Sequence, residues 1–236
     1  CSFRTGWPSA RCRFGMNKLA SKRLFIRHSV PTADYLILPG SKNATAAAEQ
    51  LDLFGYPVIC KPICSGSSLG VRIARSEEEL PAALQAAREH SDAVLVERYV
   101  SGRELTVGIL QGRALPVVEM RVAREFFDYR AKYEDAETDY ITPVALLPTI
   151  YRKVHDAALR AYQALGCRHM ARVDMIYGYD GRLAVLEVNT IPGLTPRSLL
   201  PMAAAEEGIE LEDLCNRLVL AAFQEGQAGR LQKMSA

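Results

Sequence analysis

An Asp-Gly pair between two apolar segments constrains the fold of this sequence more than any other feature. The pair occupies positions 180–181 and separates residues 168–177 from residues 182–188, two runs with the composition of buried strands. Asp-Gly is the strongest short signal for a β-hairpin, because both residues accept the backbone angles of a tight turn. If the two residues form the loop, Asp174 lies directly opposite Glu187, although a β-bulge would shift this register.

The same register places two more polar residues on the face of Asp174 and Glu187. Arg172 lies opposite Asn189, and residues two apart on a strand share a face. Two carboxylates directly opposite each other repel, so the pair needs a cation. Carboxylate and amide oxygens suit Mg²⁺ bound together with nucleotide phosphates. The alternative is an exposed polar hairpin face. Apolar neighbours favour a covered strand pair, namely Val173, Met175, Leu183, Val185 and Leu186.

A glycine–serine segment, Gly-Ser-Ser-Leu-Gly at residues 66–70, lies between two short predicted strands at residues 57–61 and 71–74. Small residues allow backbone N–H groups to approach and cradle phosphate oxygens. The spacing of a P-loop is absent, and an ordinary turn is the alternative. Lys61 favours the phosphate interpretation, because a lysine that ends a buried strand needs a charged partner.

Residues 97–104 carry a carboxylate at each end and cross from one half of the chain to the other. Ligand clefts favour such boundaries. Glu97 and Glu104 could accept hydrogen bonds from an adenine amino group and from ribose hydroxyls. A charged connector is the alternative interpretation.

Residues 192–199 follow the second strand of the hairpin, and one Gly and two Pro indicate an irregular loop. Ser198 is a good N-cap for a helix that begins after it. The N-terminus of that helix would offer an anion site facing the metal-binding strands. A plain capping role is the alternative.

Composition excludes several classes of protein. The 236 residues carry a net charge of only +2, with 49% hydrophobic and 24% charged residues. These values argue against nucleic acid as the main partner and against disorder. No apolar run approaches the roughly 18 residues of a membrane span. The six cysteines form no C-x-x-C pair, which favours buried thiols in a reducing cytoplasm over a zinc site.

The remaining pattern predicts alternating strands and helices over the first hundred residues and longer strands after residue 105. We expect helices at residues 17–28, 43–54, 76–90, 148–166, 198–207 and 211–224. We expect further strands at residues 35–38, 92–97, 105–110 and 115–120, the last two joined as a hairpin.

Taken together, these residues resemble the D-alanine–D-alanine ligases of the ATP-grasp superfamily. The matching strings occur in family order over about residues 5–224. They are Met16-Asn17-Lys18, Lys61-Pro62, Gly66-Ser67-Ser68-x-Gly70, Glu97…Gly102-x-Glu104, Asp128-Tyr129-x-Ala131-Lys132-Tyr133, Arg172-Val173-Asp174, Glu187-Val188-Asn189-Thr190 and Pro192-Gly193-x-Thr195…Ser198-Leu199.

The resemblance implies an α+β ATP-grasp fold, in which two subdomains with antiparallel sheets clasp ATP between them. Residues 17–103 would form the smaller subdomain and residues 104–236 the catalytic one. Residues 1–16 would be a remnant of an N-terminal domain that this sequence lacks. The sequence begins with Cys1 and no initiator Met, which fits a chain that enters part-way through such a protein.

The resemblance also implies roles for individual residues. ATP would be contacted by Lys18, Lys61, Ser68, Glu97, Tyr99, Val100, Glu104 and Lys132. Two Mg²⁺ (or Mn²⁺) would be held by Asp174, Glu187 and Asn189. Catalysis would use Arg172 at the oxyanion, with Ser67 and Tyr133. The amino-acid substrates would be contacted by Tyr129, Gly193, Ser198 and Leu199.

The implied activity is a cytoplasmic ligase that joins two D-alanines through an acyl phosphate, for peptidoglycan precursors. Its partners would be small molecules, with neither nucleic acid nor membrane, and the family implies a homodimer. Two departures stand out: Phe127 replaces the usual Tyr, and residues 63–65 are less polar than in the family. The alternatives are a nucleotide-binding remnant without turnover, since part of the first-substrate site is missing, and a ligase for another amino acid.

Overall fold

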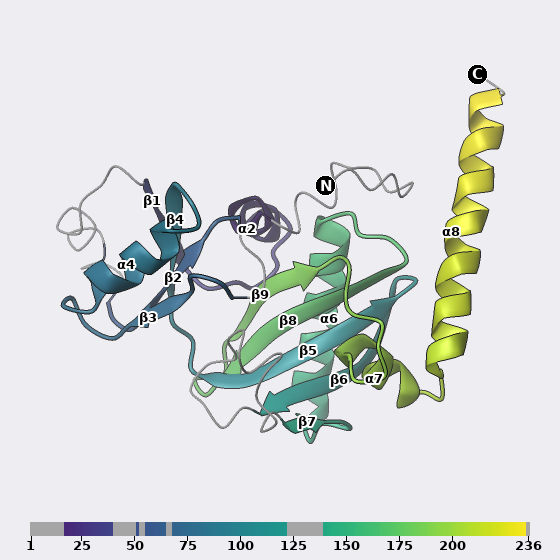
Figure 1. Ribbon diagram of the computed structural model, residues 1–236. Helices are drawn as coiled ribbons and strands as arrows, with labels where there is room; N and C mark the ends of the chain where they lie inside the picture. The colour runs from purple at the N-terminus through teal and green to yellow at the C-terminus, as the bar shows by residue number, and fades with distance from the viewer. Residues whose placement is uncertain (1–16, 40–50, 52–54, 65–67, 122–138, 235–236) are drawn as a thin grey trace.

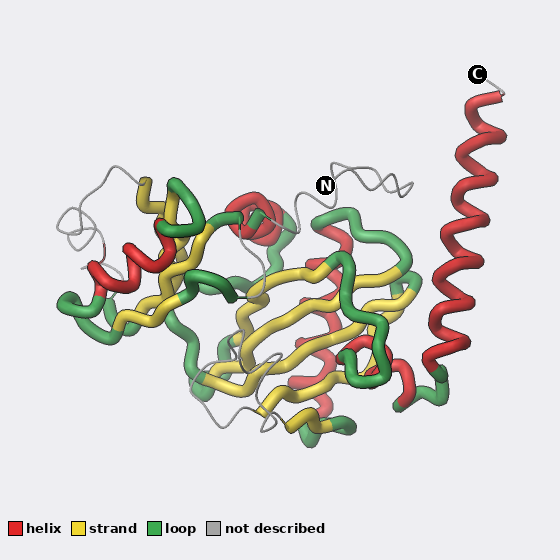
Figure 2. Tube along the Cα trace, viewed as in Figure 1, coloured by secondary structure: helices red, strands yellow, loops and turns green. Residues whose placement is uncertain are grey.

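Two antiparallel sheets, each backed by a helix, form the framework of the molecule (Figures 1 and 2). The structure is a computed structural model, and it describes residues 17–39, 51, 55–64, 68–121 and 139–234. The expected α+β architecture with two antiparallel sheets is therefore confirmed. The predicted helix at 43–54 lies largely outside the described residues.

The smaller sheet has the strand order β1-β4-β2-β3. Its strands are β1 (Tyr35–Pro39), β2 (Val58–Pro62), β3 (Arg72–Ala74) and β4 (Ala93–Arg98). Helix α4 (Leu80–Arg88) packs on one face against the inward side chains of Val58 and Cys60. Because side chains alternate along a strand, Lys61 lies on the other face of β2.

The larger sheet has the order β7-β6-β5-β8-β9. Its strands are β5 (Gly102–Leu110), β6 (Arg113–Arg121), β7 (Asp139–Ile141), β8 (Met170–Gly178) and β9 (Leu183–Asn189). Helix α6 (Pro148–Ala164) covers one face, and α7 (Leu199–Ala205) packs against β5 and β6 in a second apolar cluster. The predicted hairpin of β5 and β6 is confirmed, with Leu110 paired to Arg113 across a two-residue turn.

Helix α2 (Lys18–Arg27) lies between the two sheets (Figure 1). It begins as predicted at Asn17, whose Oδ1 accepts a hydrogen bond from the N–H of Ala20 at 2.9 Å. Phe25 is buried in the core of the larger sheet. The chain changes sheets at residues 99–101, between β4 and β5. The division into subdomains at residues 103 and 104 remains a prediction.

The predicted pairing of the β8–β9 hairpin is confirmed. Asp174 lies opposite Glu187, and Arg172 lies opposite Asn189. The four polar residues therefore occupy neighbouring positions on two paired strands, as the sequence pattern requires.

The turn that joins β8 to β9 differs from the prediction. The N–H of Gly178 donates to the carbonyl of Arg182 at 2.7 Å, and Gly181 has a φ of 79°. The loop is thus longer than the two residues at 180–181. The register then shifts by one residue at Leu186, which acts as a bulge between Asp174 and Met175. The two deviations cancel, so the carboxylate pairing is correct although the two-residue loop is wrong.

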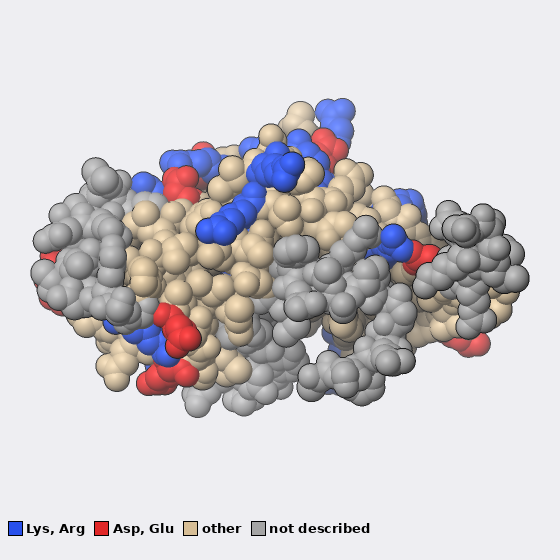
Figure 3. Space-filling view, turned by 90° about the horizontal axis from the view of Figure 1, so that it is seen from above, with Lys and Arg blue, Asp and Glu red and all other residues tan. Residues whose placement is uncertain are grey.

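The C-terminal helix α8 (Leu211–Met234) extends ten residues beyond the predicted end at 224 and stands beside the larger sheet (Figure 1). Glu225 pairs with Arg168 and with His169, whose Nε2 lies 2.7 Å from its carboxylate. Within the described residues, no helix is long and apolar enough to cross a membrane. On the face shown in Figure 3, basic and acidic side chains are interspersed, in keeping with the small net charge of +2.

Candidate active site

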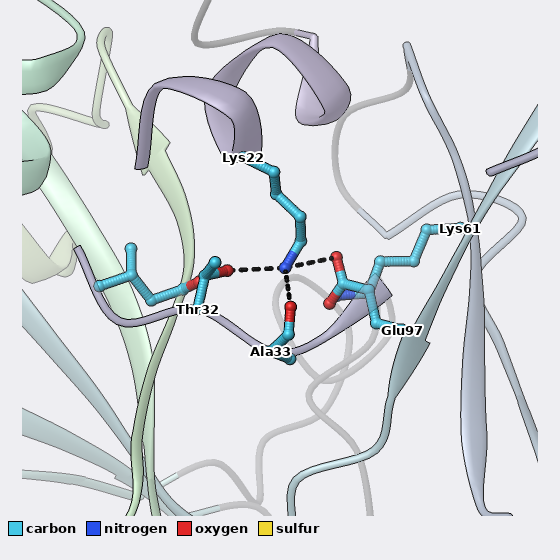
Figure 4. A network of polar contacts seen from close by, with 6 residues as sticks. Lys22, Thr32, Ala33, Lys61 and Glu97 are labelled. Carbon is cyan, nitrogen blue, oxygen red and sulfur yellow. Dashed lines mark hydrogen bonds and ion pairs between the residues drawn. The ribbon is translucent and has the colours of Figure 1, made fainter. Parts of the chain in front are cut away.

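A buried carboxylate between two lysines lies where the two sheets meet (Figure 4). Glu97 on β4 is 2% exposed, and its Oε2 accepts a hydrogen bond from Lys61 on β2 at 2.8 Å. Lys22 on α2 lies 3.3 Å from Oε1 of the same carboxylate. Strands β2 and β4 are paired, which holds Lys61 beside Glu97. The predicted need of Lys61 for an anionic partner is thus met within the protein by Glu97.

The charges of this cluster perturb one another. Burial alone would raise the pKa of Glu97, but Lys61 and Lys22 outweigh it and hold the pKa below its ordinary value. Burial lowers the pKa of Lys18, opposed mainly by the charge of Glu187. Lys18 thus connects the cluster electrostatically with the carboxylate on β9. Three ammonium groups around Glu97 leave an excess of positive charge, which suits an anionic ligand.

The second part of the site lies on β8 and β9. Arg172 donates two hydrogen bonds to Asp174, from Nε at 2.8 Å and from Nη2 at 2.7 Å. Thr106 on β5 donates a third, at 2.6 Å, to Oδ1 of this buried carboxylate. Such forked, charge-assisted bonds fix both partners in place. They also offset part of the repulsion between Asp174 and Glu187.

The oxygens on this face fit a hard divalent cation. Asp174 and Glu187 lie directly opposite each other, and Asn189 adds an amide oxygen on the same pair of strands. The Oδ1 of Asn189 accepts from the N–H of Ile191 at 3.0 Å, and a carbonyl oxygen retains a second lone pair for a metal. The described residues include no group of three or more His, Cys, Asp or Glu suited to a metal. A metal here would therefore depend on two carboxylates, Asn189 and a ligand such as phosphate.

The loop after β9 has a close internal contact. Ser198 precedes α7 but does not cap it, so the expected capping bond is absent. Its Oγ instead accepts from the N–H of Thr195 at 3.2 Å and lies 2.9 Å from the Thr195 hydroxyl. A Cβ at Gly193 would lie only 2.6 Å from Oγ of Ser198, so a larger residue at this position would displace that hydroxyl. Leu199 is the first residue of α7.

A hollow of about 450 Å³ lies beside the connection between the sheets. Tyr99 and Val100 line it, together with residues 32–34 and 179–180. None of the lysines or carboxylates of the buried clusters lines this hollow. It is therefore not the place where nucleotide phosphates would meet Lys18 and Lys61.

Comparison with known proteins identifies the family. A sequence model described as "D-ala D-ala ligase C-terminus" matches residues 24–220. The chain belongs to the D-alanine–D-alanine ligase family.

Individual members of the family agree in sequence and in structure. The D-alanine–D-alanine ligase of Geobacter sulfurreducens is 40% identical over 219 residues, covering 92% of this chain and 68% of that protein. The crystal structure of the Bacillus anthracis D-alanine–D-alanine ligase complexed with ATP superposes with a TM-score of 0.78 at 34% identity, over 96% of this chain and 70% of that one. The VanG D-Ala:D-Ser ligase of Enterococcus faecalis gives a TM-score of 0.81 at 28% identity, over 91% and 63%.

The structure brings together some of the predicted ligase residues and leaves others untested. Lys18, Lys61 and Glu97 form one cluster, and the hairpin residues form the second. Ser68 is described, with a φ of 56°, and Glu104 lies half-buried on β5. Four predicted residues lie outside the described residues, namely Ser67, Tyr129, Lys132 and Tyr133.

Two residues of the candidate site were missed by sequence reasoning. Thr106 looked like one polar residue within an apolar strand, although it holds Asp174. Lys22 was hidden among several basic residues of α2. The available signal was its spacing, because Lys22 is four residues after Lys18 and so lies on the same face of the helix.

Proposed function

We propose that this chain catalyses the ATP-dependent ligation of two D-alanines, forming a dipeptide, ADP and phosphate. The observation that carries the proposal is the opposed pair Asp174 and Glu187, with Arg172 bonded to Asp174 and an excess of lysines nearby. Membership of the ligase family supports the same reaction.

The nucleotide would lie between the two sheets. Lys18 and Lys61 would neutralise its phosphates, with Glu97 near the adenine and Glu104 at the ribose. Phosphoryl transfer depends mainly on positioning and on neutralising charge, so buried lysines at fixed positions are suited to it. The further nucleotide contacts in the proposal are Ser68, Tyr99, Val100 and Lys132.

Asp174, Glu187 and Asn189 would hold two Mg²⁺ ions. When bound, such ions neutralise charge on the transferring phosphoryl group and orient it for in-line displacement. The protein contributes the fixed carboxylates, and Thr106 and Arg172 hold Asp174 in place by hydrogen bonds.

The proposed reaction has two steps. A carboxylate oxygen of the first D-alanine attacks the γ-phosphorus of ATP, and ADP leaves, which gives an acyl phosphate. The amine of the second D-alanine then attacks the acyl carbon. The C–O bond to phosphate breaks, phosphate leaves, and the amine loses a proton.

In the second step, negative charge develops on the acyl oxygen. Arg172 would stabilise this oxyanion, because a guanidinium is planar, permanently charged and already oriented by Asp174. Ser198 and the N–H of Leu199 would hold the carboxylate of the second substrate, with Gly193 beside them. We also propose that Ser67, Tyr129 and Tyr133 act near the reacting atoms. The reaction would take place in the cytoplasm, where ATP is supplied.

The proposal is tested by measuring ADP release with Mg²⁺ and ATP, with and without D-alanine. We expect D-alanine to stimulate ADP release, with one dipeptide formed per ADP. D-serine added beside D-alanine tests the choice of acceptor, and Glu187→Gln serves as the inactive control. Nucleotide binding without stimulation by D-alanine would overturn the proposal.

A further inference from the structure

Lys22 is a buried cation that the proposed reaction does not use. Its residue exposure is 1%, and its ammonium contacts three acceptors (Figure 4). Nζ lies 2.6 Å from Oγ1 of Thr32, 3.1 Å from the carbonyl oxygen of Ala33 and 3.3 Å from Oε1 of Glu97. An ammonium has three N–H donors, so these partners use all of them. Lys22 therefore binds protein groups with all of its donors and has none left for a ligand.

Lys61 differs in this respect. Within the described part of the chain, its ammonium makes one side-chain contact, with Glu97. Counting the described residues alone, two of its three donors could serve a phosphate. Lys22 and Lys61 share one carboxylate, and only the second is suited to contact the nucleotide directly.

The contacts of Lys22 join the two sheets. Thr32, which accepts from Lys22, donates its own hydroxyl to the carbonyl of Val185 on β9 at 3.0 Å. A path of hydrogen bonds and one ion pair, between Lys22 and Glu97, therefore runs from β9 of the larger sheet through Thr32, Lys22 and Glu97 to Lys61 of the smaller sheet. Strand β9 also carries Glu187, one of the two opposed carboxylates.

The helix that carries Lys22 is itself fixed to the larger sheet. Phe25, one turn further on, is fully buried in the core of that sheet. Lys22 thus reaches Glu97 from a helix whose Phe25 is anchored in the larger sheet, while the N–H of Lys18 at its start donates to the carbonyl of Ile63, next to β2, at 3.0 Å. In the described residues, the smaller sheet, which carries Glu97 and Lys61, is joined to the larger one by residues 99–101 and, ahead of β1, by residues 28–34 that follow α2.

We propose that Lys22 is a positioning residue for ATP, which fixes Glu97, and through it Lys61, relative to the metal-binding strands β8 and β9. The inference rests on the proposed function, since it assigns the nucleotide to this cluster. Without Lys22, Glu97 retains Lys61 but loses its side-chain link to the larger sheet, and the backbone bond from Val185 to the carbonyl of Pro31 remains. The separation between the phosphate-binding lysine and the carboxylate pair is then held less tightly.

The free-energy cost of burying the Lys22 ammonium supports a role beyond packing. Burial lowers its pKa, and the neighbouring charge of Glu97 opposes that effect. Replacing a buried ion pair by apolar residues of the same volume is often neutral or stabilising for a fold. A methionine would fill the same space without the desolvation cost. A buried ammonium is therefore better explained by the arrangement that it imposes on Glu97 and Thr32.

The test compares three single variants of the full chain. Lys22→Met removes the ammonium and keeps an unbranched stem, and Thr32→Val removes the hydroxyl between Lys22 and Val185. Arg23→Met is the matched control, because Arg23 is the exposed neighbour on the same helix. For each variant we would measure KM for ATP, kcat, the Kd of Mg·ADP by calorimetry, and the urea midpoint.

For Lys22→Met we expect KM for ATP and the Kd of Mg·ADP to rise by about tenfold or more, with kcat within about threefold of the parent chain. A rise in KM with little change in kcat is expected when the lost interaction stabilises the bound substrate and the transition state equally. Thr32→Val should change the same constants in the same direction by about threefold. A fourth protein, the double variant Lys22→Met/Thr32→Val, should show a rise in KM and Kd smaller than the product of the two single effects, because both residues lie on one path. Arg23→Met should change neither constant by more than about twofold.

Unchanged nucleotide constants in Lys22→Met, with only a lower urea midpoint, would overturn the inference and leave Lys22 a purely structural residue. If Lys22→Met does not fold, the nearly isosteric Thr32→Val decides in the same way. Absence of nucleotide binding by the parent chain would instead overturn the proposed function, and the inference with it.

Discussion

Asp174 on β8 lies directly opposite Glu187 on β9, with the guanidinium of Arg172 forked across the Asp174 carboxylate. Opposed carboxylates are destabilising unless a cation lies between or beside them. Arg172 supplies part of that charge from the side of Asp174. The proposed site for a divalent ion depends on this opposed pair.

Glu187→Gln should remove metal binding without harming the fold. The substitution keeps the shape of the side chain and removes one of two repelling charges. We expect the affinity for Mn²⁺, measured by electron paramagnetic resonance, to fall by at least about tenfold. The urea midpoint should stay the same or rise. Asp174→Asn is the informative comparison, since it should lose Mn²⁺ and also stability, because half-buried Arg172 loses its charged partner. Unchanged Mn²⁺ affinity in Glu187→Gln would contradict the metal assignment.

Arg172→Lys should lower kcat far more than it raises KM for ATP. A lysine keeps the charge but cannot make the two parallel bonds to Asp174, so the donor that faces the oxyanion is no longer fixed. We expect kcat to fall by about 10²-fold or more, the size typical of a lost oxyanion donor. Steady-state kinetics at saturating D-alanine measure the effect. A rise in KM for ATP with normal kcat would assign Arg172 to nucleotide binding instead.

The Arg103–Glu119 pair should make stability depend on pH. Two hydrogen bonds of 2.8 Å from Arg103 hold the pKa of Glu119 below its ordinary value of 4.5. A carboxyl whose pKa is lower in the folded state contributes stability that is present above 4.5 and lost as pH falls through the folded-state pKa. Glu119→Gln should therefore cost about 1–3 kcal/mol at pH 7.

The difference between the parent chain and Glu119→Gln should then shrink steadily below pH 4.5. Urea unfolding of both proteins across this range measures it. Other acidic groups, Glu97 among them, affect both proteins equally, so the difference isolates Glu119. A difference that stays constant down to the lowest pH would show that Arg103 does not shift this carboxyl.

Gly102→Ala should be severely destabilising, although glycine to alanine is a small change. A Cβ at Gly102 would lie 2.3 Å from the carbonyl oxygen of Tyr177 and 2.6 Å from Cα of Gly178. Both are backbone atoms of paired β8 and cannot turn aside. We expect a loss of about 3 kcal/mol or more in the free energy of unfolding. Gly208→Ala is the control, since its φ of 73° strains the backbone without any contact within 4 Å, and it should cost about 1 kcal/mol.

The sequence allowed the fold and half of the site to be predicted, for identifiable reasons. Alternating strands and helices, the Asn17 cap and the pairing of Asp174 with Glu187 all follow from local pattern. The pairing of Asp174 with Glu187 was correct only because the longer turn and the bulge at Leu186 shift the register in opposite directions. The Asp-Gly pair at 180–181 indicates a hairpin but does not fix the length of its loop. The sequence around Leu186 does not indicate that this residue forms a bulge.

The partners of buried charges could not be predicted from the sequence. The contact of Lys61 with a phosphate stays a prediction, whereas its protein partner Glu97, 36 residues away in the chain, was not foreseen. The spacing of four from Lys18 places Lys22 and not Arg23 on the face of Lys18, but helix periodicity does not show which face is covered. Long-range pairing of β2 with β4 brings these groups together.

The most direct test of the proposed ligase is the fate of the carboxylate oxygens of D-alanine. D-alanine labelled with ¹⁸O in its carboxylate would be incubated with the chain, Mg²⁺ and ATP, and the released phosphate analysed by mass spectrometry. Attack of the carboxylate on the γ-phosphorus, followed by cleavage of the acyl C–O bond, transfers one labelled oxygen to each phosphate. We therefore predict singly labelled phosphate in equal amount to dipeptide. Unlabelled phosphate, released at the same rate with or without D-alanine, would mean that water attacks ATP and would contradict the account.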